Sequence, residues 1–171
     1  GPEISCRLLA SGVATAVANV VVVGDRRVLE RGMRDAGVEL SHHVVPAIED
    51  VRWPCEGLPV LDLGNVDPAR FPQGVGSAEC GRLTGETLKF MIDLALDGKL
   101  DGICFAPLNK GAMYQGGWKF HDEHQMFAHL TGHNGFFGEM NVIKEFSTFR
   151  VTSHVALREA VNLVTPERIA S

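Results

Sequence analysis

The 171-residue sequence lacks the features that would point to a nucleic-acid or membrane partner. Its 16 Lys and Arg residues against 21 Asp and Glu residues give a net charge of −5, and no basic block occurs. A DNA or RNA partner is therefore not expected, because neutralising a phosphate backbone takes clustered cations. The longest apolar run near the start, residues 20–23, is far shorter than the about 20 residues that span a membrane, so no membrane partner is expected.

Cysteine is scarce, and its spacing does not suit a metal knuckle. The four residues are Cys6, Cys55, Cys80 and Cys104. No two of them form a CxxC unit, so a zinc knuckle is not indicated. A secretory hydrophobic segment is also missing. We therefore expect free thiols in a reducing cytoplasm rather than disulfides.

Three motifs that would identify an enzyme class directly are absent. The sequence has no HExxH zinc-hydrolase motif and no GxSxG nucleophile elbow. It also lacks a GxGxxG dinucleotide fingerprint, because residues 74–76 have no third glycine at the required spacing and follow no strand. Any NAD site therefore has another form, and the cofactor-binding residues stay unknown.

Helix and strand signals alternate along the chain. Apolar runs closed by glycine, such as residues 19–24, are typical of strands buried on both faces, and Asp25 and Ser77 are suited to cap helices. Strands are predicted at 19–24, 38–45, 59–63, 101–105 and 149–153, helices at 2–11, 25–36, 77–97 and 123–131 with another starting at 165, and loops at 64–76 and 106–120. This order predicts an α/β fold with a mainly parallel sheet, whose ligands bind beyond the carboxyl ends of its strands.

Histidine gathers in the second half of the chain. Five of the seven lie between positions 121 and 154, namely His121, His124, His129, His133 and His154. Because imidazole binds divalent metals and titrates near neutrality, such a cluster can form a metal or acid–base site. The run 121–124 (HDEH) has a second interpretation, a solvated helix start in which the acidic residues favour the helix dipole.

Lys110 is a second candidate for chemistry. It follows Ala106 and Pro107, which come directly after the strand predicted at 101–105. A lysine there would point into the crevice above the sheet, where it could hold a carboxylate or phosphate or take part in proton transfer. The alternative is a solvent-exposed turn lysine. We expect a central strand at 101–105, with Lys110 and His154 opening on one cleft.

Several stretches, in order along nearly the whole chain, together resemble one family. GPEI at 1–4 is similar to the tail of a GDPAGIGPE motif, and GDR at 24–26 to a GD(R/P) turn. GSAECG at 76–81 is similar to G-x-S-A-x-x-G, residues 101–110 to DG-hydrophobic-TAP-x-x-K, and TSHVAL at 152–157 to T-x-H-x-P-L. These are motifs of the 4-hydroxythreonine-4-phosphate dehydrogenase family, with its threonate and erythronate phosphate dehydrogenase relatives. The resemblance implies a chain truncated at both ends.

The resemblance implies a fold like that of the isocitrate and isopropylmalate dehydrogenases. This is an α/β/α sandwich with a mainly parallel sheet, arranged as two lobes around an active cleft and working as a homodimer. It assigns residues 1–106 to the first lobe and 107–171 to the start of the second, whose C-terminal remainder is absent. Dimerisation is expected through residues 111–145. The Met and aromatic residues of that segment are Met113, Tyr114, Trp118, Met126, Phe127, Phe136, Phe137 and Met140. The alternative is that these side chains fill the core of this lobe.

The resemblance also implies a reaction. A secondary alcohol on a phosphorylated hydroxy acid, such as 4-phosphohydroxy-L-threonine, is oxidised by NAD and often decarboxylated, as a step of pyridoxal phosphate biosynthesis. A divalent metal (Zn, Mg or Co) polarises the alcohol as a Lewis acid, and the hydride passes to the nicotinamide. Relatives act on threonate or erythronate phosphates or on dihydrodiol acids, so the exact substrate stays open.

Residue by residue, the resemblance assigns a few roles. Lys110 falls on the lysine of the TAP-x-x-K segment, and we expect it to be catalytic. His154 matches the first of three metal-binding histidines, the other two lying beyond the end of this sequence. Where the family has F-x-G-H-T-E, residues 120–125 read FHDEHQ, so Glu123 falls on the substrate-binding histidine and His124 on the threonine. A shift of one residue would let His124 take the histidine's role.

Two other functions stay open. One is a metal-dependent hydrolase built on the His121–His154 cluster, with Glu123 as general base. The other is a dehydrogenase fragment without activity by itself. A requirement for NAD separates the dehydrogenase from the hydrolase.

Overall fold

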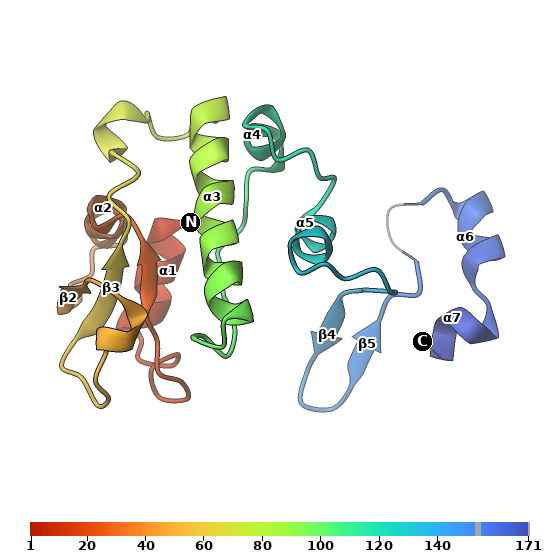
Figure 1. Cartoon of the computed structure of the whole chain (residues 1–171), viewed down its shortest axis with the longest axis horizontal. Coiled ribbons are helices and arrows are strands. Elements are labelled where there is room, and N and C mark those ends of the chain that lie inside the picture. The colour runs from red at the N-terminus through yellow and green to blue at the C-terminus, as the bar shows by residue number, and fades with distance from the viewer. Residues whose placement is uncertain (153–154, 171) are drawn as a thin grey trace. The chain divides into compact units, whose positions relative to one another are not determined.

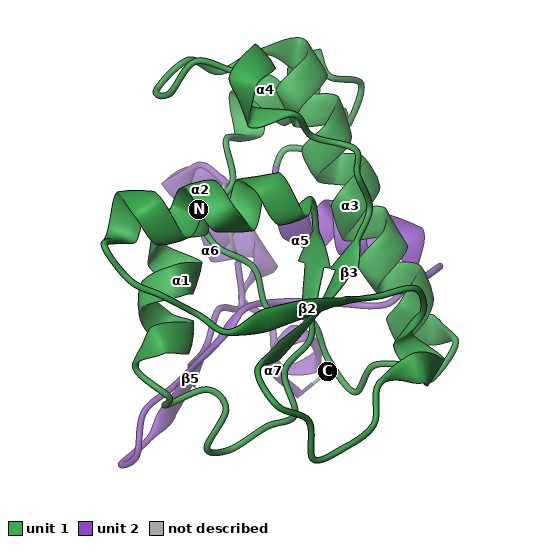
Figure 2. Ribbon diagram, turned by 90° about the vertical axis from the view of Figure 1, so that its left-hand side faces the viewer, with its two compact units in different colours: residues 1–121 green, residues 122–171 purple. Residues whose placement is uncertain are grey.

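The computed structural model describes residues 1–152 and 155–170, so His154 lies outside the described residues (Figure 1). The chain divides into two compact units, residues 1–121 and 122–171, which Figure 2 draws in different colours. The assignment of 1–106 and 107–171 to two lobes of a longer protein stays a prediction. No helix in the described ranges is both long and apolar enough to cross a membrane.

The first unit is built on a parallel sheet of three strands. β1 (Val22–Gly24), β2 (His42–Val45) and β3 (Leu58–Asp62) lie in the order β1-β3-β2, so the last strand in sequence is central. Val60 pairs with Val22 on one side and with Val44 on the other. Its side chain is fully buried, as expected in the middle of a sheet that is covered on both faces.

Helices cover both faces of this sheet, which makes an α/β/α sandwich (Figure 1). The helices are α1 (Pro2–Ala10), α2 (Arg26–Ala36) and α3 (Ala78–Leu96). One core cluster contains Cys6, Leu29, Ala36 and Val60, and the other contains Val45, Leu61 and Leu94. Val60 faces α1 and α2 while Leu61 faces α3, because successive strand residues point to opposite faces. The predicted α/β fold is confirmed.

Glycines let α4 (Lys110–Gln115) approach α3 very closely. A Cβ atom at Gly81 would lie 1.9 Å from the carbonyl oxygen of Ala112, and one at Gly85 would lie 2.0 Å from Nε1 of Trp118. That indole nitrogen donates to the carbonyl oxygen of Arg82 at 3.0 Å. Two short 3₁₀ helices, Ile48–Asp50 and Pro68–Arg70, complete the first unit.

The second unit combines helices with one hairpin. Its elements are α5 (Glu123–Leu130), β4 (Met140–Val142), β5 (Ser147–Phe149), α6 (Leu157–Leu163) and α7 (Pro166–Ala170). β4 and β5 pair antiparallel, with Met140 opposite Phe149. Met126 of α5 is the one fully buried hydrophobic side chain among the described residues of this unit.

Three sequence predictions about elements are wrong. Residues 101–105 form no strand, because a short apolar run needs a pairing partner and β1 pairs with β3 alone in the described sheet. The loop expected at 106–120 contains α4, whose cap Asn109 accepts a hydrogen bond from the backbone N–H of Ala112 at 2.9 Å. The last strand spans Ser147–Phe149 instead of 149–153.

Candidate functional site

Lys110 is the first residue of α4 and is exposed to solvent. The sequence had predicted that Lys110 follows a strand at 101–105. Those residues form no strand, so this prediction is wrong. The starts of α3 and α4 lie next to each other, because a Cβ atom at Gly76 would be 2.9 Å from Nδ2 of Asn109. A cation in a first helical turn opposes the helix dipole, so this position does not serve helix stability.

Two aspartates, Asp25 and Asp62, connect the carboxyl ends of β1 and β3. The sequence analysis identified only the first of them. Asp25, predicted as a helix cap, accepts hydrogen bonds from the backbone N–H of Arg27 at 2.9 Å and of Val66 at 2.8 Å. The Arg27 guanidinium donates to the same carboxylate at 2.8 Å and holds its pKa below the ordinary range. Asp62 accepts from the N–H of Arg26 and of Gly64, at 3.0 and 3.1 Å.

This hydrogen-bond network lies at the carboxyl edge of the sheet, where parallel sheets bind their ligands. The loop after β3 is tied to the start of α2, because Asp62 accepts two backbone N–H groups through Oδ1 and Asp25 accepts the N–H of Val66. These aspartates therefore stabilise the conformation of this edge of the sheet. Sequence reasoning missed the role of Asp62, since no local signal links residues almost 40 positions apart.

Glu123 and His124 lie in the first turn of α5, as the sequence predicted. Asp122 caps this helix by accepting from the N–H of Gln125 at 2.8 Å. Nδ1 of His124 lies 3.9 Å from the Asp122 carboxylate. The Asp122 side chain is 12% exposed and that of His124 is 39% exposed, so the imidazole reaches outward from a largely covered carboxylate.

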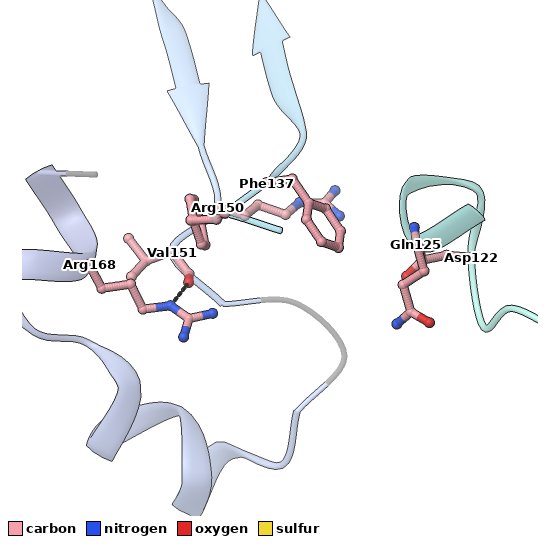
Figure 3. A pocket seen from close by; sticks show the side chains of 8 residues that line it. Asp122, Gln125, Phe137, Arg150, Val151 and Arg168 are labelled. Carbon is pink, nitrogen blue, oxygen red and sulfur yellow. Dashed lines mark hydrogen bonds between the residues drawn. The ribbon is translucent and has the colours of Figure 1, made fainter. Parts of the chain in front are cut away.

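A hollow of about 250 Å³ adjoins this helix start (Figure 3). Its wall includes Asp122, Gln125, Phe136, Phe137, Arg150 and Arg168. Arg150 is ion-paired with Glu139 at 2.9 Å, and Nε of Arg168 donates to the carbonyl oxygen of Val151 at 2.8 Å. This volume of about 250 Å³ lies just below the range of about 300 to 1,000 Å³ that is typical of small-molecule sites.

The predicted histidine cluster is not brought together in the part of the chain that the structure describes. No group of three or more His, Cys, Asp or Glu side chains in residues 1–152 and 155–170 is arranged to hold a metal ion. His133 bonds through Nε2 to the carbonyl oxygen of Phe136 at 3.0 Å, and His129 lies in the last turn of α5. His154, the predicted metal ligand, lies outside the described residues.

Comparison with known proteins gives a consistent result. The sequence profile of the family "Pyridoxal phosphate biosynthetic protein PdxA" matches residues 16–171. A Pseudomonas aeruginosa protein with the provisional name 4-hydroxythreonine-4-phosphate dehydrogenase 2 is 37% identical over 170 residues, 99% of this chain and 50% of that protein. The D-threonate 4-phosphate dehydrogenase of Cupriavidus necator is 34% identical over 166 residues, 97% of this chain and 49% of the enzyme.

The fold agrees with that match. The crystal structure of a 4-hydroxythreonine-4-phosphate dehydrogenase from Burkholderia phymatum superposes with a TM-score of 0.86 at 31% identity, over 98% of this chain and 50% of that one. The dehydrogenase-like α/β fold expected from the resemblance is thereby confirmed. The chain spans about half the length of the curated relatives it matches. It belongs to the PdxA family.

Proposed function

We propose that this chain is part of an NAD-dependent dehydrogenase that oxidises the secondary alcohol of a phosphorylated hydroxy acid, such as 4-phosphohydroxy-L-threonine, with decarboxylation of the product. The observation that carries the proposal is the family match over residues 16–171, which includes every candidate site residue. The names of the relatives support a phosphorylated hydroxy-acid substrate. The proposal includes a homodimer, a cytoplasmic location and a step in pyridoxal phosphate biosynthesis.

His124 and Glu123 contact the substrate in this proposal. His124 accepts or donates a proton through the exposed part of its ring, and its Nδ1 lies 3.9 Å from the Asp122 carboxylate. The hollow beside them provides room for an acid of a few carbons. Lys110 binds a carboxylate or phosphate group or takes the alcohol proton. NAD, when bound, accepts the hydride, which is chemistry that the cofactor brings.

A divalent metal completes the proposed chemistry. It would polarise the alcohol and the new carbonyl as a Lewis acid. The described residues alone do not assemble a ligand set, and His154 would supply one ligand. One imidazole falls short of the about three protein ligands of a catalytic site. The metal, whether Zn, Mg or Co, therefore rests on the family resemblance.

A chimera tests the proposal. Residues 1–171 replace the matching half of the Cupriavidus necator enzyme, and NAD reduction is followed by absorbance with D-threonate 4-phosphate or 4-phosphohydroxy-L-threonine, with and without each metal. The chimera is expected to reduce NAD, and the chain alone is not. His124→Ala is expected to lower kcat about 10²- to 10⁴-fold, because it removes the general acid–base group. His129→Ala, at the other end of α5, is the control and is expected to change kcat less than about twofold.

The outcomes separate the alternatives. Hydrolysis of the substrate that requires a metal but no NAD would favour the metal-dependent hydrolase. A folded chimera that binds none of these acids would contradict the proposed function.

A further inference from the structure

The hollow beside α5 has a positively charged side. Among the described residues that line it, Arg150 and Arg168 are basic and Asp122 alone is acidic. The carboxylate of Asp122 caps α5, where the positive end of the helix dipole offsets its charge. Residue 125, which also lines the hollow, is a glutamine where the family pattern F-x-G-H-T-E has a glutamate. The lining therefore favours an anionic ligand over a cationic one.

Two contacts hold the side chain of Arg168 in place. Its Nε donates to the carbonyl oxygen of Val151 at 2.8 Å, and its guanidinium lies over the ring of Phe136, 5.2 Å from the ring centroid. Figure 3 shows this side chain reaching from α7 toward the wall that Asp122 and Gln125 form. Because these contacts fix the planar group before a ligand arrives, little conformational entropy remains to be lost on binding.

Arg150 contributes less to the field in the hollow. Its guanidinium pairs with Glu139 at 2.9 Å, and its side chain is 49% exposed, so both a carboxylate and water screen its charge. The Nε of Arg168, by contrast, bonds to a neutral carbonyl group and stacks on an aromatic ring. Arg168 is therefore the residue of this hollow that suits an anionic ligand best.

We propose that Arg168 binds the phosphate group of the phosphorylated hydroxy acid, with the carbon chain of the acid directed toward the start of α5. Arginine often forms two parallel hydrogen bonds to a phosphate group. A phosphate also carries more charge than a carboxylate, about −1.5 to −2 near neutral pH, and so gains more from a guanidinium. His124 lies 3.9 Å from Asp122 of the facing wall, which places the proposed acid–base group at the other end of the ligand. The identity of the ligand rests on the proposed function, whereas the anion site rests on the geometry alone.

Binding of methyl phosphate and of D-threonate 4-phosphate to the whole chain tests this site by calorimetric titration. Arg168→Gln is expected to raise both dissociation constants at least about tenfold, because charge-assisted hydrogen bonds are lost. Arg158→Gln removes the same charge from an exposed position of α6 and should change them less than about twofold. Gln125→Glu keeps the shape of the side chain and favours the helix start, so it should fold normally and still weaken phosphate binding by repulsion.

Acetate shows which anionic group the site prefers, and it should bind more weakly than methyl phosphate. In the chimera, Arg168→Gln should raise KM for D-threonate 4-phosphate and leave kcat within about twofold, as expected for a group that binds substrate and transition state equally.

Three results would overturn the assignment: no binding of methyl phosphate to the wild-type chain, acetate binding as tight as methyl phosphate, or unchanged dissociation constants in both Arg168→Gln and Gln125→Glu. A chimera that reduces no NAD, in which Arg168→Gln still abolishes methyl phosphate binding, would contradict the proposed function and support the site.

Discussion

Asp25 links three segments of the first unit through one buried carboxylate. It caps α2, pairs with the Arg27 side chain and receives the N–H of Val66 from the loop after β3. The side-chain exposure of 1% means that water cannot replace these donors. A buried group that satisfies several donors is costly to change, because each lost bond leaves an unsatisfied partner.

Asp25→Asn is expected to lower the free energy of unfolding by about 1 to 3 kcal/mol. The amide keeps the shape of the side chain but loses the charge that pairs with Arg27 and offers one acceptor atom in place of two. The measurement is urea denaturation followed by circular dichroism. Asp93→Asn is the control, because Asp93 forms an exposed pair with Lys89 and should cost less than about 0.5 kcal/mol. Equal losses in the two variants would contradict the assignment.

The same residue predicts a pH dependence. Hydrogen bonding to Arg27 lowers the folded-state pKa of Asp25 below the unfolded value, which is about 3.9. The ionised carboxylate therefore stabilises the fold above that pH, and this contribution is lost as the pH falls through the folded pKa. The stability difference between the wild-type chain and Asp25→Asn should shrink in acid. A difference that stays constant from neutral to strongly acid pH would show that ionisation plays no part.

At the scale of elements, the contact between α3 and α4 depends on Gly81. Gly81→Ala would place a Cβ atom 1.9 Å from a backbone oxygen of α4, which no rotamer change relieves. We expect a loss of about 3 kcal/mol or separation of α4 from α3. Gly111→Ala is the control within α4, where the added carbon meets nothing closer than 3.5 Å and helix propensity gains up to about 1 kcal/mol. Thermal unfolding of both variants makes the comparison.

Caps and buried strands were predictable from sequence because their causes are local. Asp25 and Ser77 cap α2 and α3 as predicted, and Gly37 ends α2 with a φ of 65°. The segment 101–105 has strand-like composition, yet a strand exists only where a neighbour pairs with it. Local pattern carries no information about that neighbour. Helix α4 was not predicted for the same reason, because its cap Asn109 lies in a segment rich in turn residues.

The candidate site was predictable in part for the same reason. Glu123 and His124 were placed at a helix start, which a cap and its acidic neighbours reveal. Arg150 and Arg168 approach the same hollow from points well beyond that helix start, and nothing near them in sequence signals it. Their placement follows from tertiary packing, which residue types and spacing do not encode.

For the whole molecule, burial is unevenly divided. Every buried hydrophobic side chain of the described residues except Met126 belongs to the first unit. In α6, Leu157 and Val161 are 82% and 69% exposed. Because local stability follows buried apolar contacts, backbone amides of α6 and α7 should exchange with solvent much faster than those of β3. Hydrogen exchange by mass spectrometry measures this, and equal protection would contradict it.

Cys6 gives the first unit a built-in chemical reporter. The thiol has no exposed surface, its Sγ donates to the carbonyl oxygen of Leu29 at 3.6 Å, and burial raises its pKa. Alkylation needs an accessible thiolate, so Cys6 is closed to a maleimide as long as α1 stays on α2, whereas Cys104 is open to it. The rate at which Cys6 is labelled, measured peptide by peptide, therefore reports how often the sandwich opens, without any mutation.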